Sequence, residues 1–288
     1  MNIVVAMDGS KFGRQALNWA AALPLKDRPR VTALHVLDID ALRAPFVAQS
    51  MVAGNQRFIQ QEVRRMERRA AETLAEARRQ MRTLRLNGKA KELRGGVAPT
   101  ILKEAPGTHG MIVVGSQGLD ALDRLMLGSV STNVLHHASR PVLIVKAGVR
   151  TVRRIVLAAD GSTSSRHAMK WLLTKLRPTV SSSGDATRTP IHVTVVHVMP
   201  FLRYPELKEA GSRLAEECRR KLLDAGFGAD SVCRLGRPAD EIVKVAVDRR
   251  ADLIIMGAQG LGAIARLVLG SVSTRVAQRS SISVLVTR

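Results

Sequence analysis

The chain repeats itself, and this internal repeat constrains the fold more than any other feature of the sequence. The segment GSQGLDALDRLMLGSVSTNVL, residues 115–135, recurs as GAQGLGAIARLVLGSVSTRVA, residues 257–277, with fourteen of twenty-one positions identical and no gap. The opening IVVAMDGS, residues 3–10, likewise recurs as IVLAADGS, residues 155–162. A repeat of this kind predicts two copies of one structural unit.

Two compact domains also fit the length of the chain, 288 residues. We predict one domain over residues 1–148 and a second over residues 152–288. Within each half, short β-branched runs alternate with helix-length amphipathic segments, which indicates βαβ units and a parallel sheet with helices on both faces. The first-half strands are expected near residues 2–7, 31–37, 90–94, 110–114 and 141–146, and the longest helix over residues 55–84.

A glycine-rich loop follows the fourth predicted strand of each half. A glycine, two residues, a second glycine, nine residues and a Gly-Ser pair follow one another in both copies. Glycine adopts positive φ readily and admits a ligand close to the backbone, so that N–H groups can point at oxygens. The Gly-Ser pairs then open helices, whose N-termini favour an anion. The pattern predicts a phosphate cradle at the carboxyl end of the sheet, with hydroxyl donors from Ser129, Ser131, Ser271 and Ser273.

The aspartates that end the first strand of each half, Asp8 and Asp160, lie at the same edge of the predicted sheet. They are candidates for ligand contact, although aspartate also caps turns at such junctions. The glycine-rich loops have a second interpretation too, as turns kept only for packing. Arg124 and Arg266 recur at matching positions inside the loops. The sequence leaves two roles open for them: contact with a phosphate, or packing of the apolar residues of the loop.

This constellation resembles the universal stress protein family in its ATP-binding branch, and the resemblance covers nearly the whole chain as a tandem pair. It implies that the aspartate lies by the adenosine, that the residue after the second strand contacts the base, and that the loop holds ribose and phosphates. The implied first-half residues are Asp8, Val36, Gly115, Gly118, Gly128, Ser129, Val130 and Ser131. Those of the second half are Asp160, Val198, Gly257, Gly260, Gly270, Ser271, Val272 and Ser273. The implied ligand is ATP, with or without Mg²⁺.

The resemblance also implies a Rossmann-like α/β architecture of two tandem open five-stranded parallel sheets, each with strand order 3-2-1-4-5. The fifth strands, near residues 142–146 and 283–287, should approach each other, because exposed edges are covered where possible. We therefore expect an intrachain pseudo-dimer, with a further homodimer left open. The sequence departs from the family where arginine often stands between the first two loop glycines: here the residues are Ser116-Gln117 and Ala258-Gln259.

The formal net charge is +21, which attracts polyanions. Aromatic residues make up only 3% and are not interleaved with the basic ones, so a dedicated single-strand binder is not expected. We predict no specific nucleic-acid site. No apolar stretch approaches the ~20 residues that span a bilayer, and Cys218 and Cys233 lack metal-ligand spacing, which favours a cytoplasmic protein without membrane insertion.

Three function classes follow from these features. The first is an ATP-binding regulatory module of the stress response that acts on an unknown protein partner. The second is a slow ATPase or adenine-nucleotide hydrolase, and the third is a basic nucleic-acid-associating protein without nucleotide chemistry. We favour the first and predict no catalytic residue. His35 and His197 end equivalent strands without an evident nucleophile or carboxylate partner, so we interpret them as structural.

Overall fold

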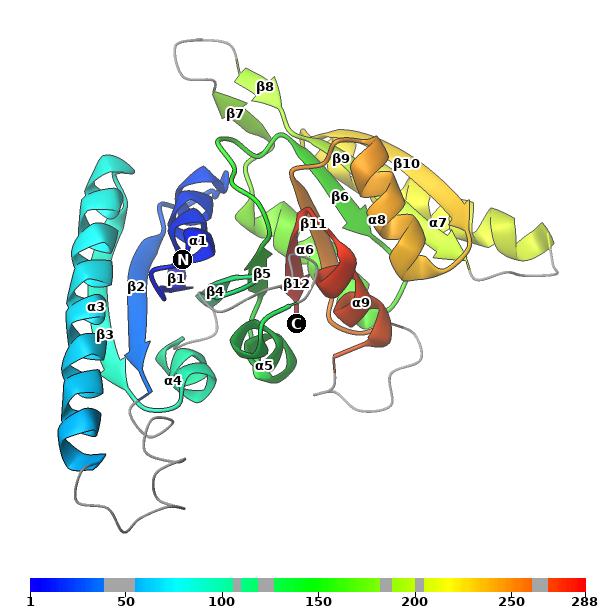
Figure 1. The fold of residues 1–288 in the computed structure, drawn as a ribbon. Helices are drawn as coiled ribbons and strands as arrows, with labels where there is room; N and C mark the ends of the chain where they lie inside the picture. The colour runs from blue at the N-terminus through cyan, green and yellow to red at the C-terminus, as the bar shows by residue number, and fades with distance from the viewer. Residues whose placement is uncertain (39–54, 106–109, 119–126, 182–187, 200–204, 261–268) are drawn as a thin grey trace.

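The computed structural model describes residues 1–38, 55–105, 110–118, 127–181, 188–199, 205–260 and 269–288. Both halves alternate strands with helices, as the periodicity predicts (Figure 1). The first half contains β1 (Asn2–Ala6), α1 (Lys11–Ala22), β2 (Arg30–Leu37), α3 (Asn55–Thr83), β3 (Asn87–Arg94), α4 (Val97–Glu104), β4 (Gly110–Gly115), α5 (Ser129–His137) and β5 (Val142–Val145). The second half contains β6 (Arg154–Ala158), α6 (Thr163–Lys175), β7 (Thr179–Ser181), β8 (Arg188–Pro190), β9 (His192–Met199), α7 (Pro205–Asp224), β10 (Gly228–Leu235), α8 (Pro238–Asp248), β11 (Leu253–Gly257), α9 (Ser271–Arg279) and β12 (Ser283–Thr287).

Ten of the twelve described strands form one sheet, in the order β10-β9-β6-β11-β12-β5-β4-β1-β2-β3. Each half contributes five parallel strands in the predicted order 3-2-1-4-5. The two fifth strands, β5 and β12, pair antiparallel in the middle of the sheet. The prediction of two tandem Rossmann-like sheets is confirmed, and the sheets are joined into one.

The two faces of the sheet carry separate apolar cores. Alternate residues along each buried strand point to opposite faces, and α1, α3, α6 and α7 cover one face while α4, α5, α8 and α9 cover the other. Val5 and Trp19 represent the first core; Ile112 and Val134 represent the second. Burial on both faces explains why β4, β5, β11 and β12 read as continuous apolar runs.

The seam between the halves is built around a local twofold relationship. Leu143 lies opposite Leu285, with Val142 opposite Val286 on one side and Ile144 opposite Val284 on the other. All of these side chains are buried. The pairing covers the free edge of each five-stranded unit, as the need to protect sheet edges predicts.

Two short strands lie outside the large sheet. The antiparallel strands β7 and β8 pair with each other, with Val180 opposite Thr189. They were not predicted from the sequence. The break expected at Pro106-Gly107 falls outside the described residues.

Candidate functional site

Each half contains a cavity at the carboxyl end of its strands, between the strand ends and two helix starts. The first-half cavity has a volume of about 410 Å³ and the second-half cavity about 350 Å³. The first is lined by Ala6, Met7, Asp8, Leu34, His35, Val36, Val97, Ile101, Val114, Gly115, Gln117, Gly118, Gly128, Ser129, Val130 and Ser131. The second is lined by Ala158, Ala159, Asp160, Ser165, Val196, Val198, Pro238, Ile242, Met256, Gly257, Gln259, Gly260, Gly270, Ser271, Val272 and Ser273. All sixteen residues that the sequence singles out thus lie in the two cavities, eight in each.

The turn after the first strand places the aspartate of each cavity. Gly9 has φ +80° and Gly161 has φ +79°, the left-handed conformation that glycine adopts most easily. The next residue, Ser10, begins α1 and accepts a hydrogen bond of 3.0 Å at its Oγ from the N–H of Gly13. Ser162 does the same for Ser165 in α6, at 3.1 Å. These serine N-caps fix where the strand-ending aspartate stands.

The two carboxylate oxygens of each aspartate have different surroundings. Oδ1 of Asp8 accepts the N–H of Ser10 at 2.9 Å, and Oδ1 of Asp160 accepts the N–H of Ser162 at 2.9 Å. The turn-capping interpretation is therefore correct for one oxygen. The aspartate still lines the cavity, so capping and ligand contact are compatible.

The second glycine of each loop is required for contact with this aspartate. A Cβ on Gly118 would lie 3.1 Å from Oδ2 of Asp8, and a Cβ on Gly260 would lie 2.9 Å from Oδ2 of Asp160. Any larger side chain would push the loop away from the carboxylate. The glycine and the aspartate thus form one wall of each cavity together.

The cradle glycines do not have the conformation that the sequence suggests. Gly128 has φ −64° and Gly270 has φ −69°, both extended, so the expectation of positive φ is wrong at these positions. In the second half, the lack of room for a side chain explains the glycine better, because a Cβ on Gly270 would lie 3.1 Å from the carbonyl oxygen of Ala258. The corresponding distance from Gly128 to the carbonyl oxygen of Ser116 is an ordinary 3.5 Å.

The serine hydroxyls of the cradle divide into two kinds. Ser131 donates its Oγ–H to the carbonyl of Gly115 at 2.6 Å, and Ser273 lies with its Oγ 2.8 Å from the carbonyl of Ala258. Their expected role as hydroxyl donors to a ligand needs correction, because these hydroxyls donate inward and tie the last helix to the loop. Ser129 and Ser271 are exposed at the helix starts.

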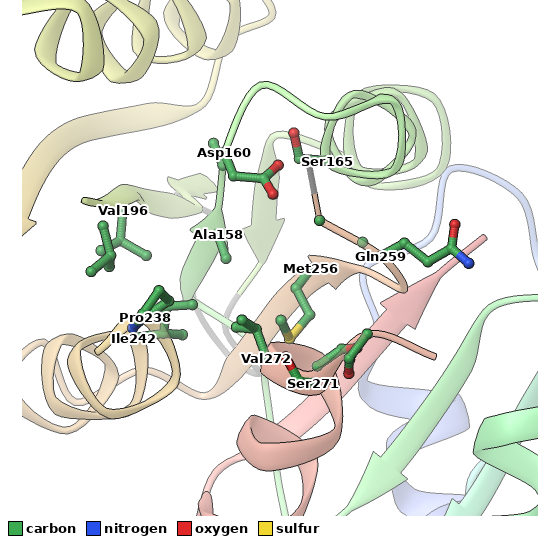
Figure 2. A pocket seen from close by; sticks show the side chains of 16 residues that line it. Ala158, Asp160, Ser165, Val196, Pro238, Ile242, Met256, Gln259, Ser271 and Val272 are labelled. Carbon is green, nitrogen blue, oxygen red and sulfur yellow. The ribbon is translucent and has the colours of Figure 1, made fainter. Parts of the chain in front are cut away.

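The opposite wall of each cavity is apolar, and the sequence analysis missed much of it. Val36 and Val198 line the cavities, and they lie within the second strand of each half rather than after it, at the next-to-last residue of β2 and of β9. Figure 2 shows Val196, Pro238 and Ile242 on one side of the second-half cavity, with Asp160 and Ser271 at its ends. The first turn of the helix that follows the third strand supplies this wall in both halves. The sequence signal for this wall was a glycine shortly before that helix in each half. These residues, Gly95 and Gly236, both have positive φ.

No lysine or arginine belongs to either cavity among the described lining residues. Arg124 and Arg266 lie outside the described residues. Asp8 or Asp160 supplies the one carboxylate among the described lining residues, and the donors to an anion among them include backbone N–H groups and the hydroxyl of Ser129 or Ser271. Within the described chain, no group of three or more His, Cys, Asp and Glu side chains could hold a metal ion.

The histidines of the second strands are anchored to the backbone. Nδ1 of His35 lies 2.7 Å from the carbonyl oxygen of Met7, and Nδ1 of His197 lies 2.7 Å from that of Ala159. Because a carbonyl only accepts, the proton lies on Nδ1 in each ring. This contact ties the end of the second strand to the end of the first and supports a structural role.

Each half also sends a basic side chain to the helix that lines the other half's cavity. Lys146, after β5, donates from Nζ to the carbonyl of Gln278 near the end of α9, at 3.3 Å. Arg288, after β12, donates to the carbonyls of Leu135 and His136 at the end of α5. Burial lowers the pKa of Lys146 to about 8 and also lowers the pKa of Arg288. Cations at helix C-termini complement the helix dipole, and here they do so across the seam.

The fold and these two cavities define a tandem Rossmann-like α/β protein with a cavity at the carboxyl ends of the strands in each half. The sequence model of the universal stress protein family matches residues 1–146 and 151–288. The chain therefore belongs to the universal stress protein family. Within the described part of the chain, no helix combines the length and apolar character needed to cross a membrane.

Full-length relatives share the tandem organisation. A universal stress protein of Mycolicibacterium smegmatis is 27% identical over 302 residues, which cover 99% of this chain and 96% of that protein. The universal stress protein Slr1230 of Synechocystis is 24% identical over 299 residues, covering 100% and 99%. The crystal structure of a universal stress protein from Archaeoglobus fulgidus has a TM-score of 0.69 at 20% identity and covers 100% of this chain and 98% of that one, a likeness in fold.

Proposed function

We propose that this universal stress protein binds ATP or a related adenine nucleotide in one or both cavities and acts as a regulatory module of the stress response. The observation that carries the proposal is the convergence of a strand-ending aspartate, a glycine-rich loop and a helix N-terminus on one cavity in each half. Volumes of about 350 and 410 Å³ fall within the usual range for small-molecule sites.

The chemistry of the lining matches the parts of a nucleotide. The apolar wall of Val198, Pro238 and Ile242 suits a base, and Asp160 at the strand end suits ribose hydroxyls, since a carboxylate accepts hydrogen bonds. The start of α9 at Ser271 suits phosphates. The N–H of Gly270 donates to the carbonyl of Ala258 at 2.7 Å, a contact that holds the start of α9 against the glycine-rich loop.

A magnesium ion would be held mainly by the phosphates of the nucleotide, with at most one carboxylate from the protein. Mg²⁺ commonly binds in this way, through substrate phosphates and one or two carboxylates. Asp8 in the first half and Asp160 in the second are the carboxylates that line the cavities among the described residues.

The anchoring of His35 and His197 favours binding over turnover, because each ring already donates its Nδ1 proton to the backbone. A slow hydrolase stays the alternative. The test begins with purified protein that is denatured to release any bound ligand, which is identified by its mass. Titration calorimetry with ATP follows, and phosphate release is measured over hours. We expect a bound adenine nucleotide or saturable ATP binding without turnover. Absence of both from folded protein would contradict the proposal, and phosphate release proportional to enzyme concentration would support the hydrolase.

A further inference from the structure

A second cavity adjoins the nucleotide cavity of the second half. It has a volume of about 700 Å³ and shares Gln259 and Gly260 with its neighbour. Its lining comprises Gly161, Ser162, Thr163, Ser164, Arg166, His167, Ala258, Gln259, Gly260 and Arg288. Three separate parts of the chain meet there: the first turns of α6, the glycine-rich loop, and the residue after β12. We refer to this space as the basic cavity.

The basic cavity contains arginine side chains, which do not occur among the described residues that line the neighbouring cavity. Arg166, His167 and Arg288 line it together with the hydroxyl groups of Ser162, Thr163 and Ser164. No aspartate or glutamate occurs among the described residues that line it. Guanidinium groups and hydroxyls are donors that match the oxygens of a phosphate. The lining thus favours an oxyanion over a neutral or cationic ligand.

Hydrogen bonds to the protein hold both arginines in place. Arg166 donates through NH1 to the carbonyl of Gly161 and through NH2 to Oγ1 of Thr163, the latter at 3.1 Å. Arg288 donates through NH2 to the carbonyls of Leu135 and His136. A guanidinium has five N–H donors, so donors remain on each side chain beyond these contacts. Side chains that are already fixed lose less freedom when a ligand binds.

The guanidinium of Arg288 is partly buried and has no aspartate or glutamate partner among the described residues. The pKa of its guanidinium is lowered, with burial as the cause, and no ion pair to Arg288 occurs among the described residues. An anion bound in the basic cavity would place a negative charge beside the guanidinium of Arg288. The carbonyls of Leu135 and His136 accept hydrogen bonds from this guanidinium, but they do not neutralise its positive charge.

The repeat provides an internal comparison for the basic cavity. The alignment that pairs Asp8 with Asp160 also pairs Phe12 with Ser164. The two residues approach the loop alike: a Cβ on Gly115 would lie 2.7 Å from the Cβ of Phe12, and a Cβ on Gly257 would lie 2.7 Å from the Cβ of Ser164. The second half has only the small Ser164 at this position, and it lines the open space. An aromatic ring at position 164 should therefore occupy part of the basic cavity.

We propose that the basic cavity is an oxyanion site that takes a phosphate group. The phosphate comes either as a separate anion or as the outer phosphates of a nucleotide that crosses Gln259 and Gly260 from the neighbouring cavity. The chemistry is the same in both cases. The site would make the second half sensitive to phosphate in a way that the first half, with Phe12 in place of Ser164, does not share.

The test is calorimetric titration of the full chain with inorganic phosphate at constant ionic strength, because screening would otherwise vary during the titration. We expect saturable binding of one phosphate per chain. Arg166→Gln should weaken it roughly tenfold, as expected for the loss of a charge-assisted contact. Ser164→Phe should weaken it at least as much by filling the space. Arg213→Gln, which removes the same charge from an exposed position on α7, is the matched control and should leave the affinity unchanged.

Each outcome decides the proposal. Absence of saturable phosphate binding would overturn it, and so would equal weakening by Arg213→Gln, because binding would then follow only the net charge. If Ser164→Phe fails to fold, as circular dichroism would reveal, Arg166→Gln still provides the test.

The source of the phosphate is distinguished with AMP and ATP. If the outer phosphates of the nucleotide occupy the basic cavity, ATP displaces inorganic phosphate. Ser164→Phe then weakens the binding of ATP but not the binding of AMP. If the anion is separate, phosphate and ATP bind together. Phosphate binding without any nucleotide binding would leave this inference standing and contradict the proposed function.

Discussion

Val145 accepts a hydrogen bond of 2.8 Å from the N–H of Ser116, so the last residue of β5 is fixed to the glycine-rich loop of its own half. The second half repeats the contact, with the N–H of Ala258 donating to the carbonyl of Thr287 at 2.8 Å. The next residue along each strand is the basic side chain that reaches across the seam, Lys146 or Arg288. The loop of one half is thereby linked to the helix that lines the cavity of the other.

The first prediction concerns the pH dependence that Lys146 imposes. Its pKa is about 8 in the folded protein and near 10.5 when unfolded, so the unfolded state binds more protons between these values. Burial of the Lys146 ammonium therefore lowers the free energy of unfolding by its full amount below about pH 8. The free energy of unfolding then rises as the pH increases from about 8 to 10.5. Relative to Lys146→Met, the wild type should gain about 1–2 kcal/mol over this interval, after allowance for solvent screening of a half-buried group.

Urea unfolding of both proteins at pH 7 and pH 10 measures this difference. Lys170→Met removes an exposed lysine from α6 and serves as the control, for which we expect no comparable change. A difference between wild type and Lys146→Met that stays constant with pH would contradict the assignment.

The second prediction concerns the seam. Leu143 and Leu285 are opposite each other and fully buried, so replacing either by alanine should cost about 2–5 kcal/mol in the free energy of unfolding. Because the side chains are neighbours, the double variant should differ from the sum of the single ones. Leu223→Ala, at a position 41% exposed, should cost much less. Denaturant titration checks all four proteins, and additive effects would indicate that the two leucines do not interact.

The third prediction concerns the cradle glycines. Gly270→Val and Gly128→Val should each abolish ATP binding in their own half, since a branched side chain would stand at the start of the cradle helix. The backbone conformation tolerates both changes, so the folds should persist. Gly270→Val should be the less stable, because its Cβ would lie 3.1 Å from the carbonyl oxygen of Ala258 against 3.5 Å for the contact of Gly128 with Ser116. We expect a cost on the order of 1 kcal/mol for Gly270→Val.

Calorimetry with ATP gives the stoichiometry of each variant, and thermal unfolding gives its stability. Gly148→Val is a suitable control, because its Cβ would face Gln15 at 3.5 Å and it does not line the cavity. ATP binding that is the same in both cradle variants as in wild type would refute the cradle assignment.

The fourth prediction concerns the net charge of +21. Duplex DNA should bind without sequence preference and lose orders of magnitude in affinity between 50 and 200 mM salt, as expected for contacts limited to phosphates. Fluorescence anisotropy with two unrelated duplexes measures this. Sequence-selective binding that survives 200 mM salt would instead indicate a dedicated nucleic-acid site.

The sequence was sufficient to predict the features that repeat or follow a period. The alternation of strands and helices follows from the periodicity of the chain, whereas the strand order and the approach of the fifth strands followed from the family resemblance. The eight predicted residues in each cavity followed from the family resemblance. They meet because parallel strands bring their carboxyl ends to one edge.

Most of the features that sequence reasoning missed depend on packing between distant segments. The extended conformation of Gly128 and Gly270 follows from their places as the N-cap residues of α5 and α9, because an N-cap residue typically has extended backbone angles. The inward hydrogen bond of Ser131 depends on the position of Gly115, sixteen residues earlier. The basic cavity arises where Ser164 and Arg288, from opposite ends of the second half, face a shared space.

The pairing of β5 with β12 has a consequence for how the protein is made. The first half is complete at β5, but its covering strand is translated roughly 140 residues later, which takes on the order of 10 s at ordinary elongation rates. During this interval the edge formed by Val142–Val145 has unpaired backbone groups and apolar side chains. The same edge on a neighbouring nascent chain is the nearest strand that can pair with it in place of β12. Closely spaced ribosomes would therefore favour pairing between two copies of β5, and the synthesis of β12 decides between this pairing and the one within a single chain.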